Sequence, residues 1–287
     1  MKQIITHPGS AHKDDFLACC LLIARFPVTI QRREPGAQDL ADPATAVVDI
    51  GLRHQPELAN FDHHQFPRDH VPTCSLSLVL QYFDLYGDAR RFCEWLEPAE
   101  WFDCRGAVDT AHYLGVERDI INKLNSPIDV SLQSAFAGEN HITSDTPLWQ
   151  MMHLIGSNML DYITSMQQHL EFLRNHVQLW PIQHEEREYQ ILFIEQVDDL
   201  PENVRSSVGF YVDEMGWQEL VIGIVYPDSR GNGYGISRFE DHQALDLTQV
   251  GSEPDVHFAH ARGFLAKTSS RDPQRLQELI KAALVAT

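Results

Sequence analysis

The start of the chain constrains the fold more strongly than any other segment. A short apolar run, Gln3–Thr6, ends at a loop that contains Pro8 and Gly9, and the segment Asp15–Arg25 that follows is apolar nearly all round. A strand, a glycine-containing loop and a buried helix in this order are typical of the first elements of an α/β domain. In such folds the loop lies at the carboxyl end of the strand, where binding and catalytic residues gather. We therefore expect an α/β domain with its functional site at this loop.

This loop and the start of the next segment are rich in side chains that bind metals. They carry His7, His12, Asp14 and Asp15. Ser10 or Asp14 could cap the following helix, but capping explains one polar residue and not four. Histidine and carboxylate are common ligands of divalent transition metals. The loop therefore favours a metal site.

Two further segments add ligands of the same kinds. Val28–Arg32 and Ala46–Gly51 read as the next strands, and Asp49 stands at the tip of the second one. A carboxylate at the end of an apolar strand is costly unless it has a partner or a metal, although a turn position is an equally open interpretation. Asp62-His63-His64 then places a carboxylate beside two imidazoles. The alternative interpretation is a polar surface loop. It is less favoured because the upstream loop also carries residues that bind metals.

The middle of the chain is predicted to be helical. Ser75–Tyr86 and Ala89–Phe102 show helical patterns, and the second leads to Asp103, which is either a helix-terminal residue or a further oxygen ligand. Thr146–Trp180 is the longest helical stretch, with apolar residues at a spacing of three to four. We expect this stretch to connect two domains.

Length and composition support two domains. The chain has 287 residues and 43% hydrophobic residues, enough to bury a full core. The predicted organisation is a parallel-sheet metal-binding domain, a connecting helix and a smaller α+β domain at residues 1–140, 141–180 and 181–287. Near the end, His260, Arg262 and Gly263 lie between apolar flanks, where they suit an anion such as phosphate better than a loop that only offsets acidity.

The charge balance limits the partners. Lys and Arg number 22 against 41 Asp and Glu, a formal net charge of -19. Such a chain has no broad basic face for a long nucleic-acid duplex, whereas bound cations could still attract a small or single-stranded phosphate ester. The five cysteines are odd in number and form no Cys-x-x-Cys pair, and no segment resembles a signal or membrane span. We expect a cytoplasmic protein that does not contact membranes.

Taken in chain order, these motifs resemble those of the melanocyte-proliferating-gene protein family, which belongs with the DHH phosphoesterases. The resemblance spans nearly the whole chain except the long middle helix. It rests on five segments: His7-Pro-Gly-Ser-Ala-His12-Lys-Asp14, Val47–Gly51, Asp62-His63-His64-Gln65, Asp103 and His257–Phe264. It implies an α/β fold with a DHH-type N-terminal domain.

The resemblance also implies an activity. The implied protein is a metal-dependent, exonuclease-like phosphoesterase. It would use two divalent ions to hydrolyse phosphodiester bonds of short single-stranded RNA or small nucleotides. Manganese is the expected metal, with magnesium or zinc as alternatives. The implied metal ligands are His7, His12, Asp14, Asp49, His63 and Asp103. Asp49 would bridge the metals and act with His64 in catalysis. The implied substrate contacts are His64, Arg238, His260, Arg262 and Gly263.

The chain departs from the family pattern at three places. Asp15 stands where Glu is common, Glu100–Gly106 is looser than Asp-x-x-Asp-Asn-Gly, and Leu265-Ala266 stands where the family has two glycines. Two other classes compete with the hydrolase. One is a zinc-dependent deacetylase, which would leave Asp62-His63-His64 without a role. The other is a non-catalytic metal-binding regulatory protein. The sequence gives no oligomeric state.

Overall fold

The computed structural model describes residues 1–123, 126–184, 187–228 and 231–285. It divides into two compact units, which we call the N-terminal unit (Met1–Ser165) and the C-terminal unit (Met166–Thr287). Each unit has its own sheet and its own hydrophobic core. In the described part of the chain, no helix is long and apolar enough to cross a membrane.

The N-terminal unit is built on a six-stranded sheet of order β4-β5-β3-β1-β2-β6. Its strands are short: β1 (Gln3–Thr6), β2 (Thr29–Arg32), β3 (Thr45–Val48), β4 (His54–Gln55), β5 (Asn60–Phe61) and β6 (His141–Ile142). β1 pairs in parallel with β2 and β3, and β3 pairs in parallel with β5. The outer strands β4 and β6 are antiparallel to their neighbours. The predicted α/β class is confirmed, but the sheet is mixed, because short return segments pair at both edges.

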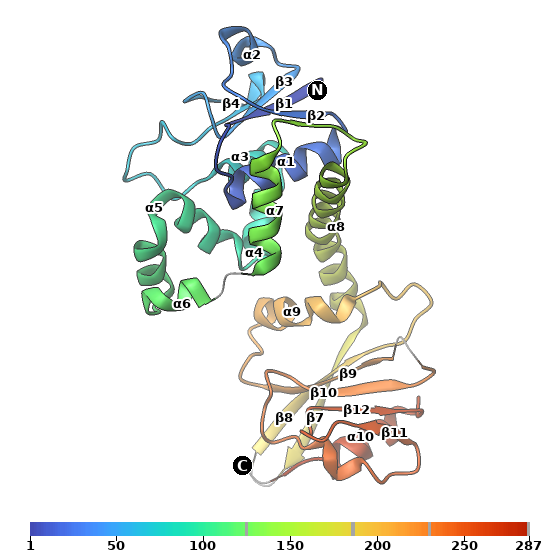
Figure 1. Ribbon diagram of the computed structural model, residues 1–287. Helices are drawn as coiled ribbons and strands as arrows, with labels where there is room; N and C mark the ends of the chain where they lie inside the picture. The colour runs from blue at the N-terminus through green and yellow to red at the C-terminus, as the bar shows by residue number, and fades with distance from the viewer. Residues whose placement is uncertain (124–125, 185–186, 229–230, 286–287) are drawn as a thin grey trace. The chain divides into compact units, whose positions relative to one another are not determined.

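Helices cover both faces of this sheet (Figure 1). α2 (Ala37–Ala41) lies on one face, and α1 (Lys13–Arg25) and α3 (Ser75–Tyr82) lie on the other. Seven apolar positions of α1 between Phe16 and Ile23 are buried, and the burial is uninterrupted from Ala18 to Ile23. This all-round burial is why the sequence lacks an amphipathic pattern here.

α1 also packs closely against α8 (Pro147–His176). A Cβ atom added to Gly156 would lie 2.0 Å from the carbonyl oxygen of Cys20. Only a residue without a side chain allows the two helix backbones to approach this closely. The core of the N-terminal unit therefore depends on a glycine that carries no catalytic chemistry.

The region around Asp103 differs from the sequence prediction. Instead of one helix over Ala89–Phe102, the chain forms α4 (Tyr86–Phe92) and α5 (Leu96–Leu114). Asp103 lies inside α5, three positions before Gly106, whose φ of 75° and ψ of 175° interrupt the helix. The helical spacing continues past Asp103, and the break comes from a glycine rather than from the carboxylate. α6 (Arg118–Lys123) and α7 (Pro127–Gly138) complete the unit.

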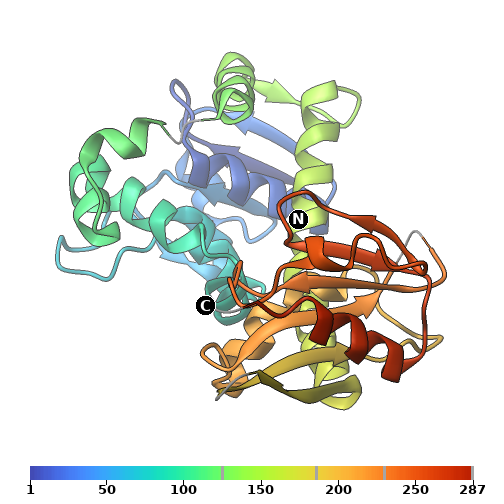
Figure 2. The ribbon, with the colours of Figure 1, turned by 90° about the horizontal axis from the view of Figure 1, so that it is seen from below.

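The C-terminal unit contains a second six-stranded sheet, of order β11-β12-β10-β9-β8-β7. Its strands are β7 (Val177–His184), β8 (Arg187–Ile194), β9 (Val221–Pro227), β10 (Tyr234–Arg238), β11 (Val256–Ala259) and β12 (Leu265–Thr268). All neighbours are antiparallel except β8 and β9. α9 (Val208–Met215) and α10 (Pro273–Ala282) lie on opposite sides of this sheet (Figures 1 and 2). The expected α+β character of this part is present.

The long helix ends earlier than the sequence pattern predicts. α8 stops at His176, and Val177 to Trp180 belong to β7. β7 pairs along its whole length with β8, and this pairing buries Trp180 and Ile182, two residues apart. Apolar residues at a helical spacing thus continue by coincidence into a strand whose own period is two. The division between the two units falls within α8.

Candidate metal centre

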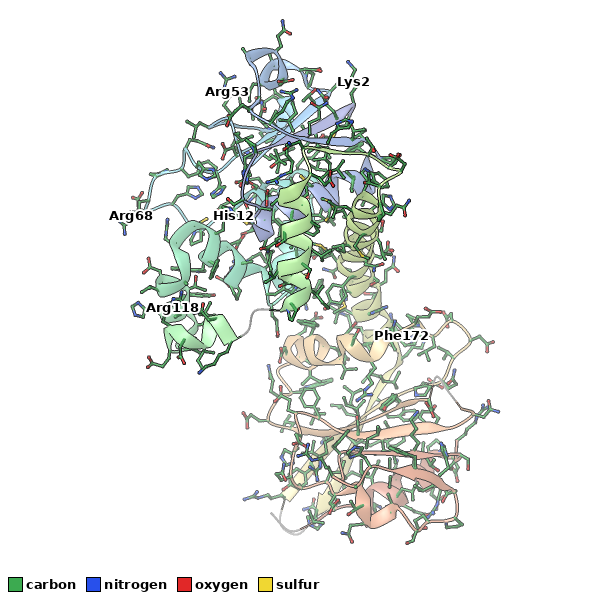
Figure 3. The ribbon with its side chains drawn as sticks, viewed as in Figure 1. Lys2, His12, Arg53, Arg68, Arg118 and Phe172 are labelled. Carbon is green, nitrogen blue, oxygen red and sulfur yellow. The ribbon has the colours of Figure 1, made fainter. Side chains whose placement is uncertain are left out.

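The loop between β1 and α1 supplies the first side chains of the centre (Figure 3). His7 directly follows β1, and its Nδ1 donates a hydrogen bond of 3.1 Å to the carbonyl oxygen of Pro8. A histidine whose Nδ1 carries the proton presents the lone pair of Nε2, and a backbone carbonyl that accepts from Nδ1 commonly orients a metal-binding histidine in this way. Gly9 turns the loop with a φ of 87°. His12, labelled in Figure 3, stands at the end of the loop, where α1 begins.

Arg32 and Asp15 hold this loop in place. Arg32 is buried on β2, and its guanidinium donates to the carbonyl oxygens of Gly9 (3.1 Å) and Ser10 (3.0 Å). Asp15 is fully buried on α1, and one of its oxygens accepts the backbone N–H of His12 at 2.8 Å. The Arg32 guanidinium lies 3.9 Å from the other Asp15 oxygen. Because a buried charge needs a partner, the two residues fix each other and the loop between them.

Asp49 stands just after β3 in a strained conformation. Its φ is 58°, in the left-handed region, which costs a residue other than glycine about 1–3 kcal/mol. Its backbone N–H donates to the carbonyl oxygen of Phe61 at 3.1 Å, and the hydroxyl of Ser75 donates to its Oδ1 at 2.7 Å. Strain of this kind persists where the surroundings hold it, and it is concentrated at functional sites.

Asp62 orients His64 rather than pointing at the other ligands. One Asp62 oxygen accepts both the backbone N–H and the Nδ1–H of His64, at 3.0 and 2.8 Å, and the other accepts the N–H of Leu52 at 2.6 Å. Asp62 is buried, whereas the His64 side chain is 53% exposed. The pair therefore presents Nε2 of His64 to solvent, as a substrate-facing imidazole requires.

His63 and Asp103 face each other across the centre. His63 Nε2 lies 3.1 Å from Asp103 Oδ2, and its Nδ1 lies 3.8 Å from the thiol of Cys104. The interruption of α5 at Gly106 ends the first part of that helix just after Asp103 and Cys104. Segments far apart in the sequence thus converge at one place.

Asp49 connects two groups of potential ligands. Its Oδ2 lies 3.4 Å from His7 Nε2, and its Oδ1 lies 3.1 Å from His63 Nε2. Four sets of side chains have ligand atoms within 4.8 Å of one another: His7, His12 and Asp49; Asp49, His63 and His64; His63, Asp103 and Cys104; and His12, Asp14 and Asp103. The structure therefore brings all six predicted ligands together.

The arrangement fits divalent metal ions. Ligands about 2.1 Å from one ion and at right angles to each other lie about 3 Å apart, close to the observed nitrogen–oxygen distances. Several buried atoms have no hydrogen-bond partner among the described residues: His7 Nε2, Asp14 Oδ1, Asp15 Oδ2, His63 Nε2 and Asp103 Oδ2. Buried polar atoms without partners are rare and need an explanation such as an ion. These buried histidine and aspartate clusters could hold metal ions.

The electrostatics of the centre point the same way. Burial, together with the nearby charge of Asp49, raises the pKa of Asp14 well above its usual value. Burial opposes protonation of His63, but the carboxylates of Asp103 and Asp49, each 3.1 Å from its Nε2, outweigh this effect and raise the His63 pKa to about 12. The Asp15 carboxylate, 3.1 Å from His7 Nε2, raises the pKa of His7. Without a cation the protein therefore tends to retain protons here, which a metal would displace.

Two pockets open at the centre, both within the N-terminal unit. One pocket, of about 530 Å³, has His7, His12 and Asp49 among its lining residues. The other, of about 240 Å³, contains His63 and Asp103 in its wall, and His12 and His64 line both pockets. The ligand set is thus accessible to a substrate rather than enclosed as in a structural metal site.

Comparison with family models supports the resemblance that the motifs suggested. Residues 3–85 match the model of the uncharacterised protein family UPF0160, named MYG1_exonuc. The match covers less than a third of the chain, so it shows a similarity of this N-terminal region to the family. The matched region includes five of the six predicted ligands and ends before Asp103. The resemblance to the melanocyte-proliferating-gene family is therefore confirmed over this region.

The other comparisons add little. None of the curated proteins compared with the chain matches it. Among solved structures, one match is a DHH domain from a protein described as a member of a family of ribosomal proteins. It has 12% sequence identity and a TM-score of 0.35 over 99% of this chain and 87% of that one. A likeness this weak carries no conclusion about fold or activity.

The remaining predicted site residues lie in the C-terminal unit. His260, Arg262 and Gly263 form the turn between β11 and β12, where the Gly263 N–H donates to the His260 carbonyl oxygen at 2.8 Å. Gly263 has a φ of 71°, and a Cβ there would lie 2.1 Å from an Asp246 oxygen. The Arg238 guanidinium lies beside it and donates to the carbonyl oxygen of Leu245 at 2.5 Å. The structure thus brings the four predicted residues of this unit together.

Three contributors to the centre are not assigned by the sequence pattern. Asp15 stands among the metal-binding residue types of the first loop without a role of its own, and Arg32 and Ser75 are not singled out. Arg32 is the last residue of a strand whose burial alternates, and it occupies a buried position. An arginine at such a position is the sequence signal that could have indicated its role. Ser75 begins α3, where a serine is an ordinary helix-start residue, and nothing in its position predicts the bond to Asp49.

Proposed function

We propose that this chain is a divalent-metal-dependent phosphoesterase that hydrolyses phosphodiester bonds of short single-stranded RNA or small nucleotides with two metal ions. The observation that carries the proposal is the position of Asp49. One of its carboxylate oxygens lies 3.4 Å from His7 Nε2, and the other lies 3.1 Å from His63 Nε2. A carboxylate shared in this way is suited to bridge two cations. The exonuclease in the name of the matching family supports the same reaction.

The residues at hand suit the chemistry. When bound, two divalent ions would lower the pKa of a water molecule and stabilise the charge that develops on the attacking and leaving oxygens. His7, His12, Asp14, Asp49, His63 and Asp103 would hold them. The strained backbone of Asp49 and its bond from Ser75 keep the bridging carboxylate in place, so it does not have to reorganise during the reaction.

His64 is proposed to act on the substrate. The hydrogen bond to Asp62 raises the pKa of His64, so its imidazole holds a proton at higher pH than an isolated histidine. A protonated, exposed imidazole beside the ligands can donate to a phosphate oxygen or to the leaving group. Asp62 acts through His64 and is a positioning residue.

The substrate class follows from charge and access. With a net charge of -19 the chain does not favour long duplexes, because these need many cationic contacts. Manganese is the proposed metal, with magnesium or zinc as alternatives. His260, Arg262, Gly263 and Arg238 remain proposed contacts to the substrate, and an arginine suits such a phosphate contact.

The direct test measures the release of mononucleotides from a short RNA oligomer by the purified protein with added manganese. The variant is Asp49→Ala, and the matched control is Asp119→Ala, which removes an exposed carboxylate on α6. We expect the first variant to lose about a thousandfold in rate, equivalent to about 4 kcal/mol, and the control to retain its activity.

Three results would contradict the proposal. Turnover that persists in the Asp49→Ala variant would remove the bridging role. Activity only on acetylated sugars with zinc would favour the deacetylase. A wild-type protein that binds manganese but cleaves neither RNA, DNA nor a simple phosphodiester would favour a non-catalytic regulatory protein.

A further inference from the structure

The smaller pocket at the metal centre is lined by two chemically different sets of side chains. One set contains the proposed ligands His63 and Asp103, and the other contains Phe66, His70 and Arg105. Both sets come from the loop after β5 and from α5, which lie side by side in the N-terminal unit (Figure 1). The second set contains none of the proposed ligands, so its side chains are available to contact a substrate.

We propose that Arg105 binds the phosphoryl group of the substrate in this pocket. The proposal rests on the proposed phosphoesterase function and names a substrate contact within that site. Among the described residues that line the two pockets of the centre, Arg105 is the one lysine or arginine. Metal ions held by the aspartates would offset the negative charge of these side chains, and an arginine beside them adds a planar fork of N–H donors that matches phosphate oxygens.

The position of Arg105 is determined by the fold. It lies on α5 two residues after Asp103 and directly before the interruption at Gly106. Its guanidinium donates to the carbonyl oxygen of His70 at 2.6 Å. The His70 ring stacks on Phe66 at 4.4 Å with an interplanar angle of 20°. The loop and the helix therefore hold the cation at the pocket that the ligands border.

Because Arg105 contacts His70, it could also serve only to anchor the loop, and this structural role must be distinguished from phosphate binding. An arginine carries five N–H donors in a planar fork, and the bond to one carbonyl oxygen uses one of them. A side chain that only anchored the loop would need no charge and no access to the pocket. Lysine preserves the charge but loses the planar fork, so the two roles predict different behaviour of Arg105→Lys.

The experiment uses the full chain loaded with manganese. It compares Arg105→Ala and Arg105→Lys with Arg118→Ala, which removes an arginine on α6 that lines neither pocket (Figure 3). Three quantities are measured: kcat/KM on the RNA oligomer, the affinity for inorganic phosphate by calorimetry, and the affinity for manganese. The activity of Arg105→Ala is also measured with added guanidinium.

We expect Arg105→Ala to lose about a hundredfold in kcat/KM, a typical loss when one donor to the reacting group is removed. Phosphate affinity should fall about tenfold, manganese affinity should stay unchanged, and guanidinium should restore part of the activity. Arg105→Lys should retain more phosphate affinity than Arg105→Ala. Arg118→Ala should behave as the wild type.

Other outcomes overturn the inference. Unchanged phosphate affinity in Arg105→Ala shows that the side chain does not bind the phosphoryl group, even if activity falls because the loop is displaced. A loss of activity that guanidinium does not restore, accompanied by a lower Tm in both variants, assigns Arg105 to loop anchoring. If the wild type hydrolyses no phosphodiester, the proposed function fails, whereas the phosphate titration still decides the role of Arg105.

Discussion

Replacing Asp14 with asparagine should stabilise the metal-free protein and weaken its response to metal. The Asp14 side chain is 3% exposed, and its Oδ1 has no hydrogen-bond partner among the described residues. Burial, then the charges of Asp49, Asp103 and Asp15, raise its pKa well above the usual value. A carboxylate that must ionise in such surroundings lowers the stability of the folded state.

The magnitude follows from the unsatisfied oxygen. A buried polar atom without a partner costs about 1–3 kcal/mol, and more when it is charged. The amide of asparagine carries no charge, and it can donate to the neighbouring carboxylate of Asp103. Its oxygen can keep the bond from the Ser75 N–H, which Asp14 accepts at 3.3 Å. We expect the metal-free Asp14→Asn protein to gain about 1–3 kcal/mol, with a Tm about 2–4 °C higher for each kcal/mol.

The pH dependence has a definite sign. The folded-state pKa of Asp14 is above the unfolded value of about 3.9. Below that value both states hold the proton, and the cost is absent. As the pH rises, the unfolded chain ionises first, so the metal-free wild type loses stability until the folded-state pKa is passed. The difference between the variant and the wild type should therefore be small near pH 4 and larger at pH 7.

The assay is thermal and urea unfolding with chelator and with saturating manganese. At a hundred times its dissociation constant, a metal stabilises the wild type by about 2.7 kcal/mol, and the loss of one ligand should reduce this gain. The control is Asp39→Asn, which removes a carboxylate paired with Arg33 at 2.8 and 3.1 Å. This variant should lose up to about 1 kcal/mol and keep the full metal response. A metal-free Asp14→Asn protein less stable than the wild type would refute the reasoning.

Two other predictions concern protons and packing. Burial opposes protonation of His63, but the nearby carboxylates of Asp103 and Asp49 raise its pKa to about 12, so manganese binding at pH 7 should release a proton. Calorimetry in two buffers of different ionisation enthalpy measures it, and identical enthalpies would contradict it. Gly156→Ala should cost about 1–3 kcal/mol, since the added Cβ would lie 2.0 Å from the Cys20 carbonyl oxygen. Urea unfolding would show this, and manganese affinity should not change.

Much of the centre could be predicted because its ligands lie in recognisable local contexts. His7 and Asp49 each follow an apolar strand, and strands that pair in parallel bring their carboxyl ends to the same edge of a sheet. Asp103 was the least defined of the six, since it lies within a helix whose interruption depends on Gly106. A helical pattern by itself does not show where such an interruption falls.

The sequence by itself determined the parallel strand core, the buried first helix and the ligand types, because these depend on local hydrophobic pattern and side-chain chemistry. Only the tertiary structure decided which oxygen of Asp49 meets which histidine, and that Arg32 and Ser75 hold the centre from β2 and α3. It also placed Arg105 at the pocket through a bond to a loop 35 positions away in the sequence. Such contacts join segments that are distant in the chain, so their geometry depends on packing rather than on local spacing.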